Sequence, residues 1–104
     1  MWKARGNDLQ MDEGDYGVAL PFVVKGTTLT AADCMRFVFM DGQSGETVLE
    51  KSFTDIQNNT VLFILTQEES AQLPGGAYVY DLEWYQDGVF QCKLIQNGIF
   101  KVVA

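Results

Sequence analysis

Residues 77–96 read AYVYDLEWYQDGVFQCKLIQ, and they carry the clearest structural signal in the chain. Four large side chains in the first half alternate with mostly polar neighbours: Tyr78, Tyr80, Leu82 and Trp84. Such alternation is typical of a strand with one buried face. Asp87 and Gly88 then supply the residue pair favoured in tight hairpin turns. The stretch therefore predicts a β-hairpin whose aromatic side chains contribute to the core.

Short apolar blocks of the same kind recur along the chain, separated by Gly, Asn and Asp clusters. The expected strands cover residues 17–25, 34–40, 46–53, 59–66, 77–86, 89–96 and 99–103. Thr66 and Glu69 form a capping-box pattern, which predicts one short helical turn near residues 67–72. The pattern as a whole predicts a single all-β domain over residues 1–104, an immunoglobulin-like antiparallel β-sandwich of about seven strands.

The alternation also assigns faces to individual residues. Met35, Phe37 and Phe39 are expected to point into the core. The run 59–66, NTVLFILT, is nearly continuous in apolar residues, which predicts that both of its faces are covered. In the second hairpin strand, Phe90, Cys92 and Leu94 are expected to share one face, and Asn97 with Gly98 suggests a bulge.

Composition and charge exclude several classes of function. The chain has 104 residues, a net charge of -7 and a sequence pI near 4.2. The negative electrostatic field of such a chain repels the phosphate backbone of nucleic acids, so we expect no nucleic-acid partner. There is no apolar run of the length needed for a membrane span or a signal peptide, so we expect no membrane partner.

The sequence contains no histidine, the side chain that most often serves as a general base or metal ligand. We therefore expect neither an enzyme nor a cofactor. Cys34 and Cys92 form no CxxC pair, and a zinc site is not expected. Reduced thiols are the first interpretation of these two cysteines, and a disulfide between two strands stays open.

Two clusters of carboxylates are candidate sites. Asp12, Glu13 and Asp15 can be a solvated loop or a calcium site, and the solvated loop is favoured, so no metal is predicted. Asp81 and Glu83 share one face of the predicted aromatic strand, at a spacing known from sugar hydrolases. A solvated sheet face is the favoured interpretation of this pair, and a hydrolase remains a third possibility.

Four stretches together resemble a known family. They are RGNDLQM at residues 5–11, CMRFVFMD at 34–41, LTQEESAQLPGGAYVYDLEWYQDG at 65–88 and IQNGIFKVV at 95–103. Their order and spacing are similar to the N-terminal domain of phage baseplate upper proteins and related small β-sandwich proteins of phage and prophage structural modules. The resemblance implies a non-enzymatic virion protein of the tail, baseplate or fibre attachment, made in the cytoplasm of a bacterial host and assembled in several copies with other virion proteins.

An assembly subunit of this kind docks by its surface, through edge strands and aromatic anchors. Candidate contact residues are Trp2, Met11 and Tyr85, because all three are large and expected to be exposed. The alternative function is a small-ligand or carbohydrate-binding module. That alternative requires a patch with at least two exposed rings, and an exposed Trp84 would favour it. Alternation places Trp84 and Tyr80 on the core side and leaves Tyr85 alone among exposed rings.

Overall fold

The computed structural model describes residues 2–104 of the chain. In chain order the elements are β1 (Lys3–Arg5), β2 (Asp8–Asp12), β3 (Leu20–Val23), β4 (Asp33–Asp41), β5 (Thr47–Phe53), β6 (Thr60–Phe63), α1 (Gln67–Ala71), β7 (Gly76–Gln86) and β8 (Val89–Val103). With 5 residues, α1 is much too short to cross a membrane, and it is the only helix in this part of the chain.

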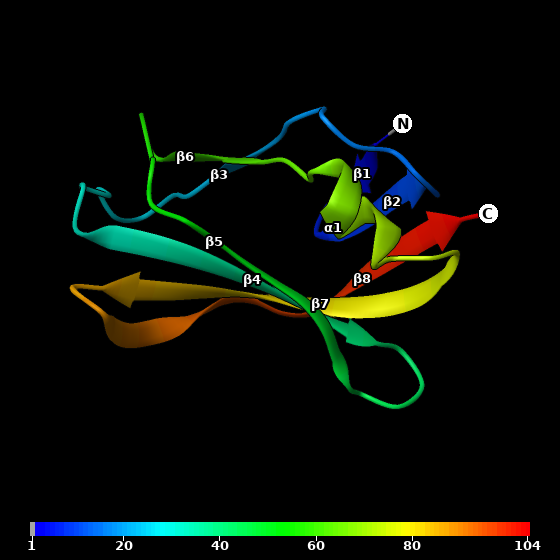
Figure 1. Cartoon of the computed structure of the whole chain (residues 1–104). Coiled ribbons are helices and arrows are strands. Elements are labelled where there is room, and N and C mark those ends of the chain that lie inside the picture. Colours follow the sequence, from blue (N-terminus) through cyan, green and yellow to red (C-terminus); the bar gives the residue numbers. More distant parts are fainter. Residues whose placement is uncertain (1) are drawn as a thin grey trace.

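The strands form two layers. Six of them make one sheet in the order β1-β2-β8-β7-β4-β5, while β3 and β6 pair separately as a two-stranded sheet, called the β3–β6 ribbon below. The ribbon lies across one face of the larger sheet (Figure 1). The predicted all-β sandwich is therefore confirmed. Its eight described strands divide into six and two, whereas an immunoglobulin constant domain divides into four and three.

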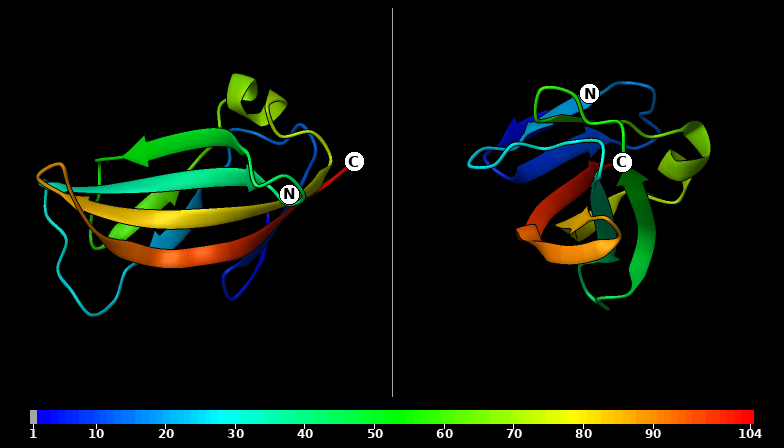
Figure 2. Two further views of the ribbon diagram at one scale, coloured as in Figure 1. Left: turned by 90° about the horizontal axis from the view of Figure 1, so that it is seen from below. Right: turned by 90° about the vertical axis from the view of Figure 1, so that its left-hand side faces the viewer.

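The core lies between the two layers and is rich in aromatic rings. Met35, Phe37 and Phe39 on β4 are completely buried, as predicted from their alternation. The other face of the long strands carries no second layer in the described chain: β5, β4, β7 and β8 lie side by side with nothing over them (Figure 2, left). This open face is called the outer face of the large sheet.

The N-terminal segment supplies two strands that the sequence analysis did not anticipate. β1 and β2 form a hairpin, and β2 then pairs with β8 in the parallel direction, with Leu9 opposite Phe100. All other strand pairs are antiparallel, so the large sheet is mixed rather than purely antiparallel. Leu9 and Met11 point inward from β2 and extend the core beneath this end of the sheet.

The predicted turns are confirmed by the backbone angles. Asp87 and Gly88 have φ values of 51° and 77°, which suit the sharp hairpin between β7 and β8. Asn58 and Asn59 also have positive φ, at the reversal before β6. The Asn59 side chain bonds the Leu29 amide and the Thr27 carbonyl, so this reversal also holds the loop that follows β3.

The predicted helical turn is present as α1. The Thr66 hydroxyl accepts a hydrogen bond from the Glu69 amide, and the Glu69 carboxylate accepts one from the Thr66 amide, which together form the expected capping box. Lys51 on β5 donates to Glu69 as well, at 2.5 Å. Burial raises the pKa of Glu69, but the hydrogen bonds from Lys51 and Thr66 outweigh it and hold that pKa below its usual value. This contact ties α1 to the edge of the large sheet.

The prediction that both faces of residues 59–66 are covered is wrong. Val61 and Phe63 point into the core, whereas Leu62 and Ile64 on the other face are 55% and 37% exposed. The reason is the ribbon's position: it forms an outer layer of the sandwich, so only one of its faces meets another sheet. The exposed face therefore keeps an apolar surface in contact with solvent.

Gly98 on β8 has the least room for a side chain among the glycines of residues 2–104. The β8 bulge around Asn97, whose φ is 54°, brings Gly98 opposite Tyr80. A β-carbon at this position would lie 2.5 Å from the Tyr80 ring. The Tyr80 hydroxyl in turn donates to the Asn7 carbonyl in the turn between β1 and β2. Burial, assisted by the Asp8 charge, raises the pKa of Tyr80 to about 12.

Gly98→Ala is expected to destabilise the fold by about 1–3 kcal/mol, because the added methyl group overpacks the Tyr80 ring. Urea denaturation at neutral pH measures this change. Gly76→Ala is the matched control: its β-carbon would meet no atom closer than 3.9 Å, so its effect should stay within about 0.5 kcal/mol. Equal midpoints for Gly98→Ala and the unmodified protein would contradict the packing argument.

Candidate functional site

Met11 is not available as a surface contact. Its side chain is completely buried on β2, opposite Val102 of β8. The prediction that Met11 is exposed is therefore wrong, because the N-terminal segment joins the large sheet instead of lying as a loop on its surface. Alternation of Leu9 and Met11 with the polar residues Asp8 and Gln10 was the signal that could have revealed this strand.

Trp2 is half-buried between the layers. Its ring lies 5.7 Å from Phe63 and 5.8 Å from Phe100, measured between ring centroids. The indole N–H donates to the Val18 carbonyl at 3.1 Å. These contacts fasten the N-terminal segment to the core, and part of the ring remains accessible at the sandwich edge. A contact role for Trp2 stays a prediction.

Tyr85 lies on the outer face of the large sheet, near the β7–β8 turn, whereas Met11 lies at the other end of the sheet, opposite Val102. It lines a shallow, open hollow of about 420 Å³. The lining residues come from three strands and the hairpin turn: Cys34, Arg36, Glu50, Ser52, Tyr85 and Gly88. Strand pairing explains this grouping, because Cys34 is opposite Tyr85 and Arg36 is opposite Ser52. This region is called the Tyr85 surface.

A second ring stands beside Tyr85, contrary to expectation. The pairing of β7 with β8 shifts between Trp84 and Tyr85, so that Phe90 is opposite Tyr85 while Cys92 is opposite Trp84. The Phe90 and Tyr85 ring centroids are 5.5 Å apart, and Phe90 is 48% exposed. The prediction that Phe90 shares a face with Cys92 is thus wrong, because the shift reverses the alternation. The Tyr85 surface therefore carries two rings.

Charged residues surround these rings. Arg36 forms ion pairs with Glu50 on β5 and, at 3.9 Å, with Glu83 on β7. The hydrogen bond from Arg36 to Glu50 raises the pKa of the arginine above its usual value. Tyr85 donates to Glu83 at 3.2 Å. The Tyr85 surface thus combines two rings with an ordered set of one cation and two anions.

Asp81 and Glu83, the carboxylate pair weighed for a hydrolase, have separate partners. Asp81 is nearly buried and accepts hydrogen bonds from Lys93 and from the Asn97 amide, each at 2.8 Å. Its contact raises the pKa of Lys93. Glu83 instead belongs to the Arg36 network. Asp81 therefore lies beneath a lysine in the sheet face, which differs from the solvated position expected for it.

Trp84 lies on the core side, as predicted. Its ring is half-buried against the hydrophobic core, and its indole N–H donates to the Asp33 carboxylate at 2.7 Å. Asp33 is itself buried and also accepts a hydrogen bond from the Thr30 amide at 2.6 Å. This placement removes Trp84 from the set of rings available to a carbohydrate.

The cysteines and the acidic loop provide no shared site. Both thiols are free, and Cys34 and Cys92 lie on opposite faces of the sheet, opposite Tyr85 and Trp84 respectively. Glu13 accepts a hydrogen bond from the Gly75 amide, and Asp15 accepts one from the Asp12 amide. Within residues 2–104 no three Cys, Asp or Glu side chains converge on one point.

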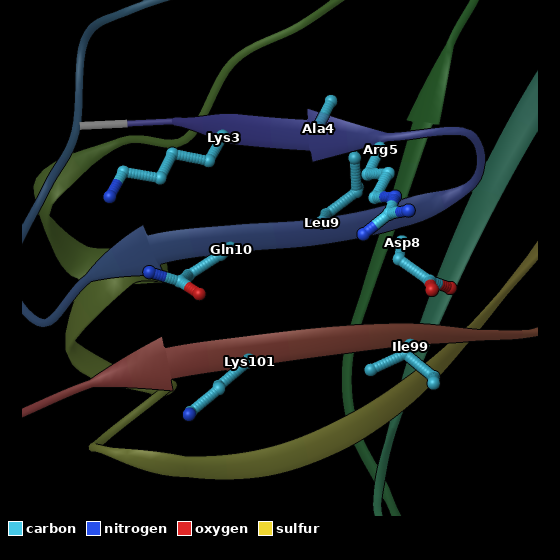
Figure 3. A pocket seen from close by; sticks show the side chains of 8 residues that line it. All are labelled: Lys3, Ala4, Arg5, Asp8, Leu9, Gln10, Ile99 and Lys101. Carbon is cyan, nitrogen blue, oxygen red and sulfur yellow. The ribbon is translucent and has the colours of Figure 1, made fainter.

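A second hollow, of about 230 Å³, lies at the other end of the outer face, over β1, β2 and β8. Lys3, Gln10 and Lys101 stand side by side across these three strands (Figure 3). Arg5 and Asp8 form the neighbouring row with Ile99. The surface formed by Lys3, Arg5 and Lys101 is called the basic face.

Comparison with known proteins gave no match by family model, by curated sequence or by solved structure. The resemblance to phage baseplate domains consequently remains an expectation from the four stretches quoted above. In the structure these stretches form the turn before β2 with most of β2, then β4, the segment through α1 and β7, and most of β8. Candidate sites are therefore judged on their own chemistry.

Stability should depend on pH through Asp33. Burial raises the pKa of Asp33, but hydrogen bonds from Thr30 and Trp84 outweigh burial, so the folded pKa lies below the usual value. A lowered folded pKa stabilises the protein above the unfolded value, about 3.9, and this contribution is lost as pH falls through the folded pKa. Asp33→Asn should cost about 1–2 kcal/mol at pH 7, and the difference should shrink in acid.

Urea denaturation at a series of pH values between about 7 and about 3 tests this pH dependence. Trp84→Phe removes one of the donors to Asp33 and should give a pH dependence between those of the unmodified protein and Asp33→Asn. Parallel curves for Asp33→Asn and the unmodified protein would show that Asp33 does not supply the acid sensitivity.

Proposed function

We propose that the protein is a non-enzymatic structural component of a phage or prophage virion, in the tail, baseplate or fibre attachment, and that it docks by its surface in several copies. The observation that carries the proposal is the apolar outer face of the β3–β6 ribbon. Three side chains on it are exposed by 60%, 55% and 37%: Val23, Leu62 and Ile64. A compact protein that leaves such a face open in water gains free energy when a partner covers it.

Charge favours the same face for contacts between copies. The chain has a net charge of -7, so two copies repel each other over most of their surfaces. The ribbon strands read LPFV and TVLF and contain no charged residue. Two ribbon faces can therefore meet with few like charges between them, Asp55 beside Leu62 being at the border, which supports association between copies and with other virion proteins.

The resemblance supports the same proposal. Its four stretches cover most of β2 and β4, all of β7 and the second part of β8, and these strands are neighbours in the large sheet. The ribbon lies outside these stretches, and in this proposal it is the part of the chain that contacts partners. The protein would act in the virion after synthesis in the host cytoplasm, with no cofactor and with neither nucleic acid nor membrane as a partner.

Light scattering behind a sizing column, over a range of protein concentrations, tests the assembly. We expect a defined oligomer. Val23→Thr should raise its dissociation constant at least about tenfold. Each substitution replaces one buried methyl group, worth about 0.8 kcal/mol, with a hydroxyl, and a two-fold contact contains the substitution twice.

Val89→Thr is the matched control. Val89 is 61% exposed, against 60% for Val23, and it lies in β8 beside the hairpin turn, outside the ribbon. A monomer at every concentration, or an equal effect of Val89→Thr, would contradict association through the ribbon face.

A second candidate function is a small-ligand or carbohydrate-binding module at the Tyr85 surface. The specific observation in its favour is that Phe90 stands beside Tyr85, so the surface has the two rings that sugar stacking requires. Arg36 and Glu50 supply a donor and an acceptor beside them. This combination is suited to a polar ligand with an apolar face.

An NMR titration with a panel of mono- and disaccharides tests this second function. If it is correct, shifts should be confined to residues around Tyr85, and Tyr85→Ala should weaken binding at least about fivefold, since a buried aromatic contact is worth about 1 kcal/mol or more. Tyr16→Ala is the control, because Tyr16 is a 52% exposed ring elsewhere on the surface. Absence of any saturable shift would contradict a carbohydrate site here.

A further inference from the structure

The basic face concentrates unpaired positive charge on an acidic protein. The described ion pairs use three of the chain's basic residues: Arg36, Lys51 and Lys93. Four basic residues of the described chain have no such pair, and three of them form the basic face, with Lys25 as the fourth. The basic face is therefore a local site for negative charge on a molecule whose overall charge is negative.

The register of the strands sets the spacing of these charges. Lys3 is opposite Gln10, and Gln10 is opposite Lys101. Because adjacent strands lie about 4.8 Å apart, the two lysines are about 10 Å apart at the backbone, with the Gln10 amide between them. Figure 3 shows all three side chains on the same face of the sheet. A carboxylate placed over Gln10 can reach both ammonium groups and the amide donor.

The basic face also borders an unpaired strand. β1 is the outermost strand of the large sheet, and β2 is its one partner in residues 2–104. Arg5 and Asp8 flank the two-residue turn of the hairpin, so they form a hydrogen-bonded pair. Hydrogen-bonded and non-hydrogen-bonded pairs alternate along an antiparallel ladder, so the next pair, Ala4 with Leu9, is not hydrogen-bonded, and the Ala4 N–H and C=O point away from β2. Those two groups are free to pair with a further strand, which is a common mode of peptide recognition.

A third hollow lies on the other side of the same edge. It has a volume of about 210 Å³ and is situated between the β1–β2 hairpin and β3. Six of its eight lining residues have apolar side chains: Ala4, Leu9, Leu20, Pro21, Phe22 and Val23, beside Gly6 and Asn7. The surface that the hollow exposes is nevertheless mostly polar. Side chains alternate in direction along a strand. A strand added to β1 would therefore direct one set of side chains toward the basic face and the other set into this hollow, beside Ala4 and Phe22.

We infer that the β1 edge binds an extended acidic segment of a partner protein, which adds as a strand and alternates acidic with small apolar residues. The acidic side chains lie beside Lys3 and Arg5, within the field of Lys101, and the apolar ones enter the hollow beside Ala4. A nucleic acid would satisfy the three cations but would leave the unpaired backbone of β1 without a partner strand. The inference rests on the proposed docking function and adds the chemistry of one partner.

A short capped peptide in which Glu and Val alternate is the probe. Titrated into the isotopically labelled full-length protein at low salt, it should shift amide signals of β1, β2 and residues 99–101. Lys3→Glu should weaken binding at least about fivefold, the scale of one exposed ion pair. Lys25→Glu changes the net charge equally and should leave binding unchanged. Raising the salt to about 0.5 M, where charges are screened within about 4 Å, should also weaken it.

Two further probes separate strand addition from simple charge attraction. The same peptide with alternate backbone nitrogens methylated keeps its charges but loses donors, and it should bind more weakly. A single-stranded oligonucleotide of matched charge should not shift β1. Equal binding of the methylated peptide, equal binding of the oligonucleotide, an equal effect of Lys25→Glu, or no binding of the Glu–Val peptide would each overturn the inference. Val23 lines this hollow and also lies on the ribbon face, so the titration uses the lowest protein concentration of the light-scattering series, where contacts between copies are weakest. Loss of peptide binding under that condition overturns the inference, whereas loss of the oligomer at high concentration overturns the ribbon-face proposal.

Discussion

Insertion of the Phe63 ring between the layers holds the sandwich together. A two-stranded sheet is marginally stable by itself in water, and β3 and β6 pair only with each other in the described chain. Phe63 compensates by packing against the large sheet: its ring centroid is 4.7 Å from Phe37, 5.6 Å from Phe39 and 5.8 Å from Phe53. The apolar ribbon face and the hollow beside β1 both exist because this ring fixes the ribbon in place.

Sequence reasoning succeeded where the signal was local. The alternation around Phe37, the Asp87–Gly88 turn and the capping box at Thr66 depend on neighbours within a few residues, and the structure confirms them. Predictions from the sequence were wrong where a residue's position depends on pairing with a strand far away in the sequence. Met11 is buried because β8 pairs with β2, and Phe90 changes face because the β7–β8 register shifts. The basic face also could not be predicted, because Lys3 and Lys101 come to the same surface only through the pairing of β1 with β2 and of β2 with β8.

The molecule presents different chemistry on different sides. The ribbon offers an uncharged apolar face, the β1 edge offers unpaired backbone beside cations, and the Tyr85 surface offers rings within an ion-pair network. Each arises from strand alternation, because a residue that faces away from the core is free of packing constraints. The three kinds of surface therefore lie at fixed positions on one sandwich.

The parallel pairing of β2 with β8 has a consequence for the order of folding. Leu9 is opposite Phe100, so a strand near the start of the chain forms its hydrogen bonds with one that a ribosome makes much later. Closing so long a loop is costly in entropy, and contacts of such sequence separation slow folding. Until β8 arrives, Leu9 and Met11 have no sheet to cover them. This edge of the sheet thus stays open in the nascent chain until β8 has been made, and β8 then covers Leu9 and Met11.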